Sequence, residues 1–105
     1  MSKSRFDVIA RIRWYTEAEG GRRILPTGRI YGTNVYFEKD STLWSAVILL
    51  EQNVPVDRIQ DVKIGFFVRE YLEKELVVGK QIFICEGPVR IVAEGEIISV
   101  NEKPH

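Results

Sequence analysis

Residues 6–14 read Phe6-Asp7-Val8-Ile9-Ala10-Arg11-Ile12-Arg13-Trp14. Apolar side chains recur at every second position from Phe6 to Trp14, and the two arginines fall on the positions between them. This period of two is typical of a β-strand with one buried face. The segment therefore predicts a strand whose apolar face lies in the core and whose arginines lie outside.

The rest of the chain repeats this strand pattern between turn signals. The further predicted strands are residues 29–37, 43–51, 62–69, 81–85 and 89–100. Residues 43–51 are apolar on both alternating sets, so a short buried helix is the alternative there, and the β-branched Val47 and Ile48 favour a strand. Residues 71–76 tolerate a helical turn. Val89, Ile91, Ala93 and Ile97 are expected to share one face of the last strand.

Glycines mark the predicted reversals. The pair Gly20-Gly21 supplies the positive φ that a tight reversal needs. Gly79 and Gly87 mark the reversals before and after the fifth strand. Gly32 lies inside a predicted strand, which indicates a bulge or a bend.

Six strands with almost no helix predict an all-β fold. The 105 residues contain no repeat or Ser/Gly-rich linker, so we expect a single domain over residues 1–105. Its core is expected to span about residues 6–100, with a frayed tail at 101–105. The architecture is predicted to be a closed six-stranded antiparallel barrel, with a sandwich as the alternative, because closure removes exposed strand edges.

Composition excludes several classes of protein. With 45% hydrophobic and 29% charged residues, the chain resembles an ordinary globular domain. Its longest uncharged apolar run, 46–50, is too short to span a bilayer, and residues 1–7 carry no apolar secretory signal. The lone Cys85 excludes an internal disulfide and is typical of a reducing compartment, so we expect a cytoplasmic location.

The residues of common catalytic and metal sites are missing from the sequence. His105 is the sole histidine and stands at the last position, so no histidine triad or histidine–metal site is expected. No glycine-rich phosphate-binding motif occurs. Cys85 alternates with Ile82 and Ile84, which predicts an outward-facing packing residue. We therefore expect no enzyme activity, no cofactor and no metal.

Charge is divided unevenly along the chain. Residues 1–50 carry eight basic and five acidic side chains, and residues 51–105 carry seven and ten. The two halves either attract each other in the folded domain or leave a basic surface for phosphate or an acidic partner. The formal net charge of zero weighs against general nucleic-acid affinity.

Arginine and tyrosine are the candidate binding residues. Arg5, Arg11 and Arg13 are expected on one face of the first strand, with Arg22 and Arg23 in the loop that follows. Arginine pairs with phosphate and exposed tyrosine stacks on bases, and Tyr15, Tyr31 and Tyr36 lie nearby in the sequence. The alternative is that these arginines pair with carboxylates on neighbouring strands while the tyrosines cover the rim of the core.

Two stretches resemble a known family. The first runs through Glu19-Gly20-Gly21-Arg22, Pro26, Gly28 and Val35-Tyr36-Phe37. The second is residues 79–95, Gly79-Lys80-Gln81-Ile82-Phe83-Ile84-Cys85-Glu86-Gly87-Pro88-Val89-Arg90-Ile91-Val92-Ala93-Glu94-Gly95. In this order they are similar to the C-terminal β-barrel domain of elongation factor Tu, here as a stand-alone domain.

The resemblance implies a six-stranded antiparallel barrel with a non-catalytic role. In the family this barrel contacts the T stem of aminoacyl-tRNA, the exchange factor and the GTPase domain. Arg22, Glu86 and Gly87 match family positions near the tRNA backbone. The family's Arg-Pro pair is absent from residues 28–34, and the loop at 86–90 is one residue longer.

The sequence thus predicts a non-enzymatic interaction module that binds a protein partner and has no membrane partner. The alternative is binding of tRNA or other RNA through its backbone, in translation, by the basic N-terminal half. A small enzyme or ligand carrier that uses the barrel mouth is the third hypothesis. The candidate binding residues are Arg11, Arg13, Arg22, Arg29, Glu86 and Gly87.

Overall fold

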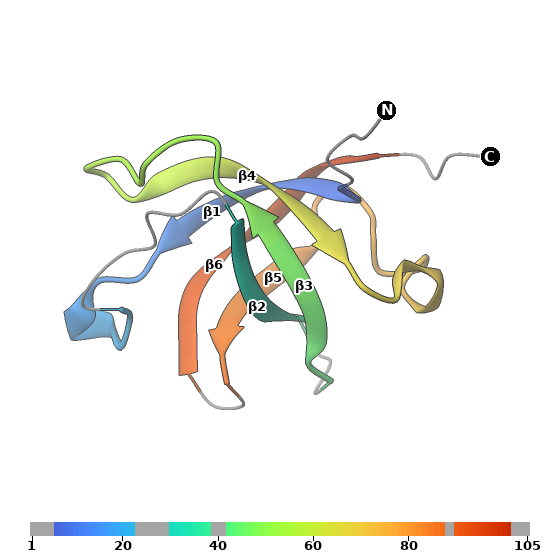
Figure 1. Ribbon diagram of the computed structural model, residues 1–105, viewed down its shortest axis with the longest axis horizontal. Helices are drawn as coiled ribbons and strands as arrows, with labels where there is room; N and C mark the ends of the chain where they lie inside the picture. The colour runs from blue at the N-terminus through green and yellow to red at the C-terminus, as the bar shows by residue number, and fades with distance from the viewer. Residues whose placement is uncertain (1–5, 23–29, 39–41, 88–89, 102–105) are drawn as a thin grey trace.

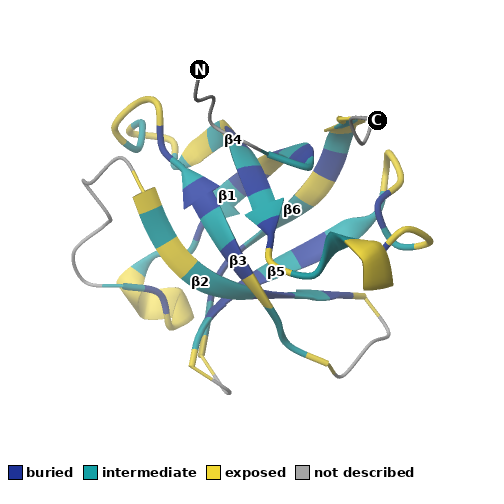
Figure 2. Ribbon diagram, turned by 45° about the vertical axis from the view of Figure 1, so that its right-hand side comes forward, coloured by how far each residue is buried: buried dark blue, intermediate teal, exposed yellow. Residues whose placement is uncertain are grey.

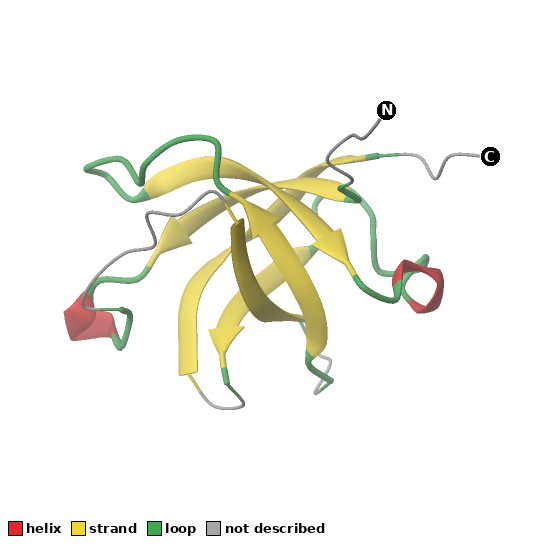
Figure 3. Cartoon of the chain, in the orientation of Figure 1, coloured by secondary structure: helices red, strands yellow, loops and turns green. Residues whose placement is uncertain are grey.

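The computed structural model describes residues 6–22, 30–38, 42–87 and 90–101. They form a closed antiparallel β-barrel of six strands, as the alternation predicts (Figures 1 and 3). The strands are β1 (Val8–Trp14), β2 (Ile30–Phe37), β3 (Trp44–Leu49), β4 (Ile59–Phe66), β5 (Gln81–Glu86) and β6 (Arg90–Val100). Two short 3-10 helices, η1 (Glu17–Glu19) and η2 (Arg69–Tyr71), lie in the connections.

The strands follow one another around the barrel in the order β1-β4-β3-β2-β5-β6, and β6 pairs with β1 to close it. Strands β2, β3 and β4 are consecutive antiparallel neighbours, and β5 returns to pair with β2. Strands β2 to β5 therefore form a Greek key. The order places β1, from the basic half of the chain, between β4 and β6, from the acidic half.

Buried and more exposed residues alternate along the strands (Figure 2), and the buried ones form one apolar core cluster. In β1 the buried residues are those predicted from the sequence, Val8, Ala10, Ile12 and Trp14, each at most 1% exposed. Trp14 and Phe37 are the largest fully buried side chains. Burial of one large apolar side chain stabilises the fold by roughly 1.5–3 kcal/mol, so these side chains contribute much of the stability of the barrel.

The connection between β4 and β5 closes one end of the barrel. Leu72 and Leu76 from this connection are buried in the core cluster. The Gly79 amide donates to the Ile97 carbonyl at 2.7 Å, which fixes the end of the connection to β6. The helical turn expected at 71–76 begins earlier, at Arg69, because the chain leaves the sheet after Phe66. Strand β4 in turn begins at Ile59, three residues before the predicted strand.

Three local expectations are corrected. The β2–β3 ladder runs through Gly32 without a register shift, so of the two alternatives predicted there, a bulge or a bend, the bulge is absent. Register shifts lie instead along β6: one with β1, between Ile9 and Ala10, and one with β5, where Ile84 pairs with Ala93 and Cys85 pairs with Ile91. The shift with β5 leaves Val92 as an extra residue on β6, and Val92 is buried while Ile91 is half-buried.

The third correction concerns the predicted frayed tail at 101–105. Asn101 is tied down: its amide donates to the Asp7 carbonyl and its side-chain amide to the Phe6 carbonyl. Its own carbonyl accepts from Arg69, which also pairs with the Asp7 carboxylate at 3.0 Å. Hydrogen bonds therefore join the segment before β1 to the end of β6. The rest of the predicted tail lies outside the described residues.

Strand β6 approaches β1 closely at Gly95. Gly95 pairs with Ile12 of β1 on one side and with Ile82 of β5 on the other. A Cβ atom at Gly95 would lie 2.1 Å from the Arg11 carbonyl oxygen and 2.7 Å from the Ile12 Cα. Both contacts are with backbone, so a side chain fits only if β1 and β6 move apart.

We predict that Gly95→Ala destabilises the barrel. The methyl group forces a backbone shift at the closing seam, an overpacking effect that typically costs about 1–3 kcal/mol. The free energy of unfolding, measured by urea denaturation, is expected to fall by that amount.

Gly32→Ala is the matched control. Gly32 is also a strand glycine, but nothing lies within 4 Å of its added Cβ. It is expected to be neutral, or to stabilise by up to about 1 kcal/mol because alanine loses less backbone entropy. Equal effects of the two substitutions would contradict the account of the seam.

Candidate interaction surface

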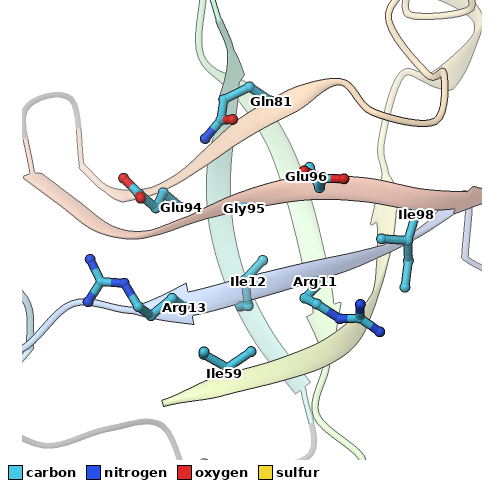
Figure 4. Close-up of a pocket in the computed structure, with 9 residues that line it drawn as sticks. All are labelled: Arg11, Ile12, Arg13, Ile59, Gln81, Glu94, Gly95, Glu96 and Ile98. Atoms are coloured by element: carbon cyan, nitrogen blue, oxygen red, sulfur yellow. The ribbon is translucent and has the colours of Figure 1, made fainter. Parts of the chain in front are cut away.

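An open groove of about 430 Å³ lies on the outside of the barrel, over β1, β5 and β6. Figure 4 shows Arg11 and Arg13 along β1, Glu94 and Glu96 on β6 to either side of Gly95, and Gln81 on β5. The groove is lined by Arg11, Ile12, Arg13, Ile59, Gln81, Glu94, Gly95, Glu96 and Ile98. Two predicted site residues, Arg11 and Arg13, thus line one recess.

Arg11 faces carboxylates on both sides. It makes two hydrogen bonds to Asp61 of β4, at 2.9 and 3.2 Å, and it pairs in register with Glu96 of β6. The Arg11–Asp61 pair is exposed. Solvent screens such an exposed pair, so it contributes little to the stability of the fold.

Arg13 is engaged in the same way. Its guanidinium donates two hydrogen bonds to Glu19 of η1, at 2.9 and 3.0 Å, and Arg13 pairs in register with Glu94. Glu19 is held in place by a capping box, in which the Thr16 amide donates to its carboxylate at 2.8 Å. These bonds to Arg13 and Thr16 lower the pKa of Glu19 to about 2.

The groove lining carries two arginines, Arg11 and Arg13, and two glutamates, Glu94 and Glu96. Asp61 and Glu19, which lie beside the groove and bind the two arginines, bring this group to four carboxylates and two guanidinium groups. Individual surface pairs are too weak to block a competing phosphate, but the surrounding negative charge opposes a polyanion. Of the two alternatives that the sequence left open for these arginines, the structure shows pairing with carboxylates on neighbouring elements.

A second cluster joins Arg22 and Glu86, which the resemblance to elongation factor Tu singles out. Arg22 Nη1 lies 2.8 Å from Glu86 Oε2, and the Tyr31 hydroxyl donates to the same oxygen. The Arg22 guanidinium lies over the Tyr31 ring, 5.4 Å from its centroid, and this ring packs edge-on against Trp14. Burial, followed by the bond to Glu86, raises the pKa of Tyr31.

Turn glycines place this cluster. Of the pair predicted to have positive φ, Gly20 has it and Gly21 does not. Gly21 is required for a different reason, because its Cβ would meet the Tyr15 carbonyl oxygen at 2.4 Å. Gly87 also has positive φ. Arg90 joins the two loops by donating to the carbonyls of Gly20 and Gly21. Gly87 therefore lies in the turn beside the Arg22–Glu86 pair.

The remaining candidates fall in different places. Arg5, Arg23 and Arg29 lie outside the described residues. Tyr15 covers the rim of the core: its hydroxyl donates to Glu94 at 2.7 Å, and burial together with this bond raises the pKa of Tyr15 to about 12.

Cys85 is buried rather than exposed. Only 2% of the residue is accessible, and it lies outside the main core cluster. Its backbone carbonyl accepts from the Thr33 hydroxyl at 2.6 Å. Burial raises the pKa of the thiol, which keeps it protonated and unreactive at neutral pH.

Sequence reasoning missed the partners of the arginines. Asp61 and Glu19 are the carboxylates bound by Arg11 and Arg13, and neither was a candidate. The Thr16–Glu19 spacing is a capping-box signal that indicates an ordered Glu19. Asp61 had no such signal, because its contact with Arg11 depends on the register between β1 and β4.

Two general findings and the comparisons with known proteins complete the description. Within the residues that the structure describes, no helix has the length and apolarity needed to cross a membrane, and no group of three or more His, Cys, Asp or Glu side chains is placed to hold a metal ion. No protein-family model matches the chain, and no curated protein matches it.

We predict that Glu19 titrates with a pKa near 2 in the folded protein. Its ordinary value is 4.5, so the folded-state pKa is lowered. The stabilisation by this carboxylate is therefore complete above about pH 4.5 and is lost as the pH falls toward 2. The measurement is an NMR titration of the side-chain carboxyl carbon.

Arg13→Gln is expected to shift the Glu19 pKa upward, because it removes the largest cause of the lowering. Arg11→Gln is the control, since Arg11 binds Asp61 and not Glu19. A Glu19 pKa that stays unchanged in Arg13→Gln would contradict the assigned ion pair.

Proposed function

We propose that this barrel is a non-enzymatic interaction module that binds a protein partner through its outer surface. It resembles the C-terminal barrel of elongation factor Tu in two sequence stretches, and the six-stranded fold is compatible with that relationship. The single observation that carries the proposal is the pairing of Arg11 and Arg13 with Asp61 and Glu19. These arginines are the residues expected to meet phosphate, and they lie in a surface with an excess of carboxylates.

The state of the interior supports the same proposal. Trp14, Phe37, Ile48 and Ile64 fill the barrel and are at most 1% exposed. A carrier or enzyme that works through the barrel mouth needs a pocket lined by apolar and converging polar groups. The groove described above lies outside the barrel, where a macromolecular partner has access to it.

Binding of RNA is the second candidate, and one observation favours it. Arg22 and Glu86 lie side by side next to Gly87 and Tyr31, so the positions matched to the tRNA-contacting part of the family share one surface. Arg22 is tied to a carboxylate, which lowers its availability for phosphate. We therefore give the protein-binding proposal preference.

Two measurements test the proposal together. Tagged protein is used to capture partners from native lysate, with an excess of untagged protein as competitor and with RNase treatment in parallel. Binding of labelled tRNA and of a generic RNA is titrated at about 50 and 200 mM salt. We expect to capture a protein whose recovery is abolished by the untagged competitor and is unchanged by RNase treatment. We expect no RNA binding at the lower salt.

Arg22→Gln is the informative variant for the RNA candidate. If tRNA binds in a steeply salt-dependent way and Arg22→Gln weakens it, the protein-binding proposal is replaced by RNA binding. The proposal is also contradicted if the tagged protein captures no protein that the untagged competitor displaces.

A further inference from the structure

We propose that the groove over β1, β5 and β6 receives a basic, partly apolar segment of the protein partner, with a lysine or arginine placed at Glu94 and Glu96. This inference rests on the proposed function and names the chemistry of its partner. Three features support it: the carboxylates Glu94 and Glu96 in the groove, the apolar residues at its borders, and the hydrogen-bond acceptors that Glu96 leaves unused.

The carboxylates of β6 are available to a cation. The hydrogen bonds of Arg11 and Arg13 go to Asp61 and Glu19, and not to the carboxylates of β6. Within the described residues, Glu96 takes part in no ion pair and no hydrogen bond of its side chain. Each carboxylate accepts up to about four hydrogen bonds, so a guanidinium or ammonium group finds acceptors there.

Glu94 is positioned by its neighbour. The Tyr15 hydroxyl donates to Glu94 Oε1, which holds the side chain and leaves its other oxygen available. Glu94 and Glu96 are two residues apart on one strand, about 7 Å at the usual rise, with Gly95 between them (Figure 4). A single cationic side chain therefore meets negative charge from both.

The groove has apolar borders on both sides. Ile59 is 45% exposed and lines it at the β4 side, and Ile98 lines it along β6. Beyond the groove lining, Phe83 of β5 pairs in register with Glu94 and stacks on Tyr36, with ring centroids 4.8 Å apart. Aromatic faces attract cations as well as apolar groups. A segment that combines a basic residue with neighbouring apolar residues complements these features.

The volume is consistent with insertion of side chains from such a segment. At about 430 Å³ the groove falls within the range of roughly 300–1,000 Å³ typical of binding pockets. Negative charge along β6 and β4 repels nucleic acid and anionic lipid from this face. The observations therefore favour a basic protein segment over either of these.

The test uses a library of random peptides displayed on phage and selected against the full chain. We expect selected peptides to be enriched in lysine or arginine beside apolar residues. Amide shifts in NMR on adding a selected peptide are expected at Gln81 and at residues 94–98. Glu96→Gln and the double variant Glu94→Gln/Glu96→Gln keep the side-chain shape, and we expect them to weaken peptide binding at least about tenfold, the usual effect of losing a charge-assisted hydrogen bond.

Glu70→Gln is the matched control, since Glu70 is an exposed carboxylate of η2 outside the groove. It is expected to leave peptide binding unchanged. Selection of neutral or acidic peptides, selection of none, or equal binding by the double variant would overturn the inference.

The lysate capture separates this inference from the proposed function. A partner that is captured equally by the double variant contradicts the groove assignment and leaves the module function standing. Failure to capture any competed protein contradicts the module function itself.

Discussion

The close approach of β6 to β1 at Gly95 is the constraint on which the rest of the structure depends. Gly95 is paired on both sides, with Ile12 and with Ile82, and the space where its side chain would stand is taken by the Arg11 carbonyl. This contact joins the first strand to the last and removes both free edges of the sheet. It also sets the spacing of Arg11 and Arg13 from the carboxylates of β6.

Closure explains the uneven charge along the chain. Strand β1 belongs to the basic half, and its neighbours β4 and β6 belong to the acidic half. Arg11 therefore stands between Asp61 and Glu96. Opposite charges that are far apart in the sequence become cross-strand neighbours, so the surplus of basic residues in the first half leaves no basic face on β1.

Much of the fold was predictable because alternation is a local property. The pattern in residues 6–14 correctly gave the buried face of β1, and the six strands and their closure followed from similar segments. Register between strands is not local, so the extra residue at Val92 and the burial of Cys85 were not visible. The same holds for Asp61, whose contact with Arg11 depends on pairing across fifty residues.

The candidate site was predictable only in part. The shared face of Arg11 and Arg13 follows from the period of two, and the matched positions Arg22 and Glu86 do come together. The gathering of carboxylates in and beside the groove required knowledge of which strands are neighbours. With that knowledge, the ligand that we propose for this groove is a basic protein segment and not the phosphate of the RNA alternative.

The most direct test of the central claim is the set of nuclear Overhauser effects between backbone protons of β1 and β6 in solution. Closure at Gly95 predicts contacts between Ala10 and Ile97, Ile12 and Gly95, and Trp14 and Ala93. These contacts are expected to be as strong as those between β2 and β3. Their absence, with the β2–β3 contacts intact, would show an open sheet and contradict the account.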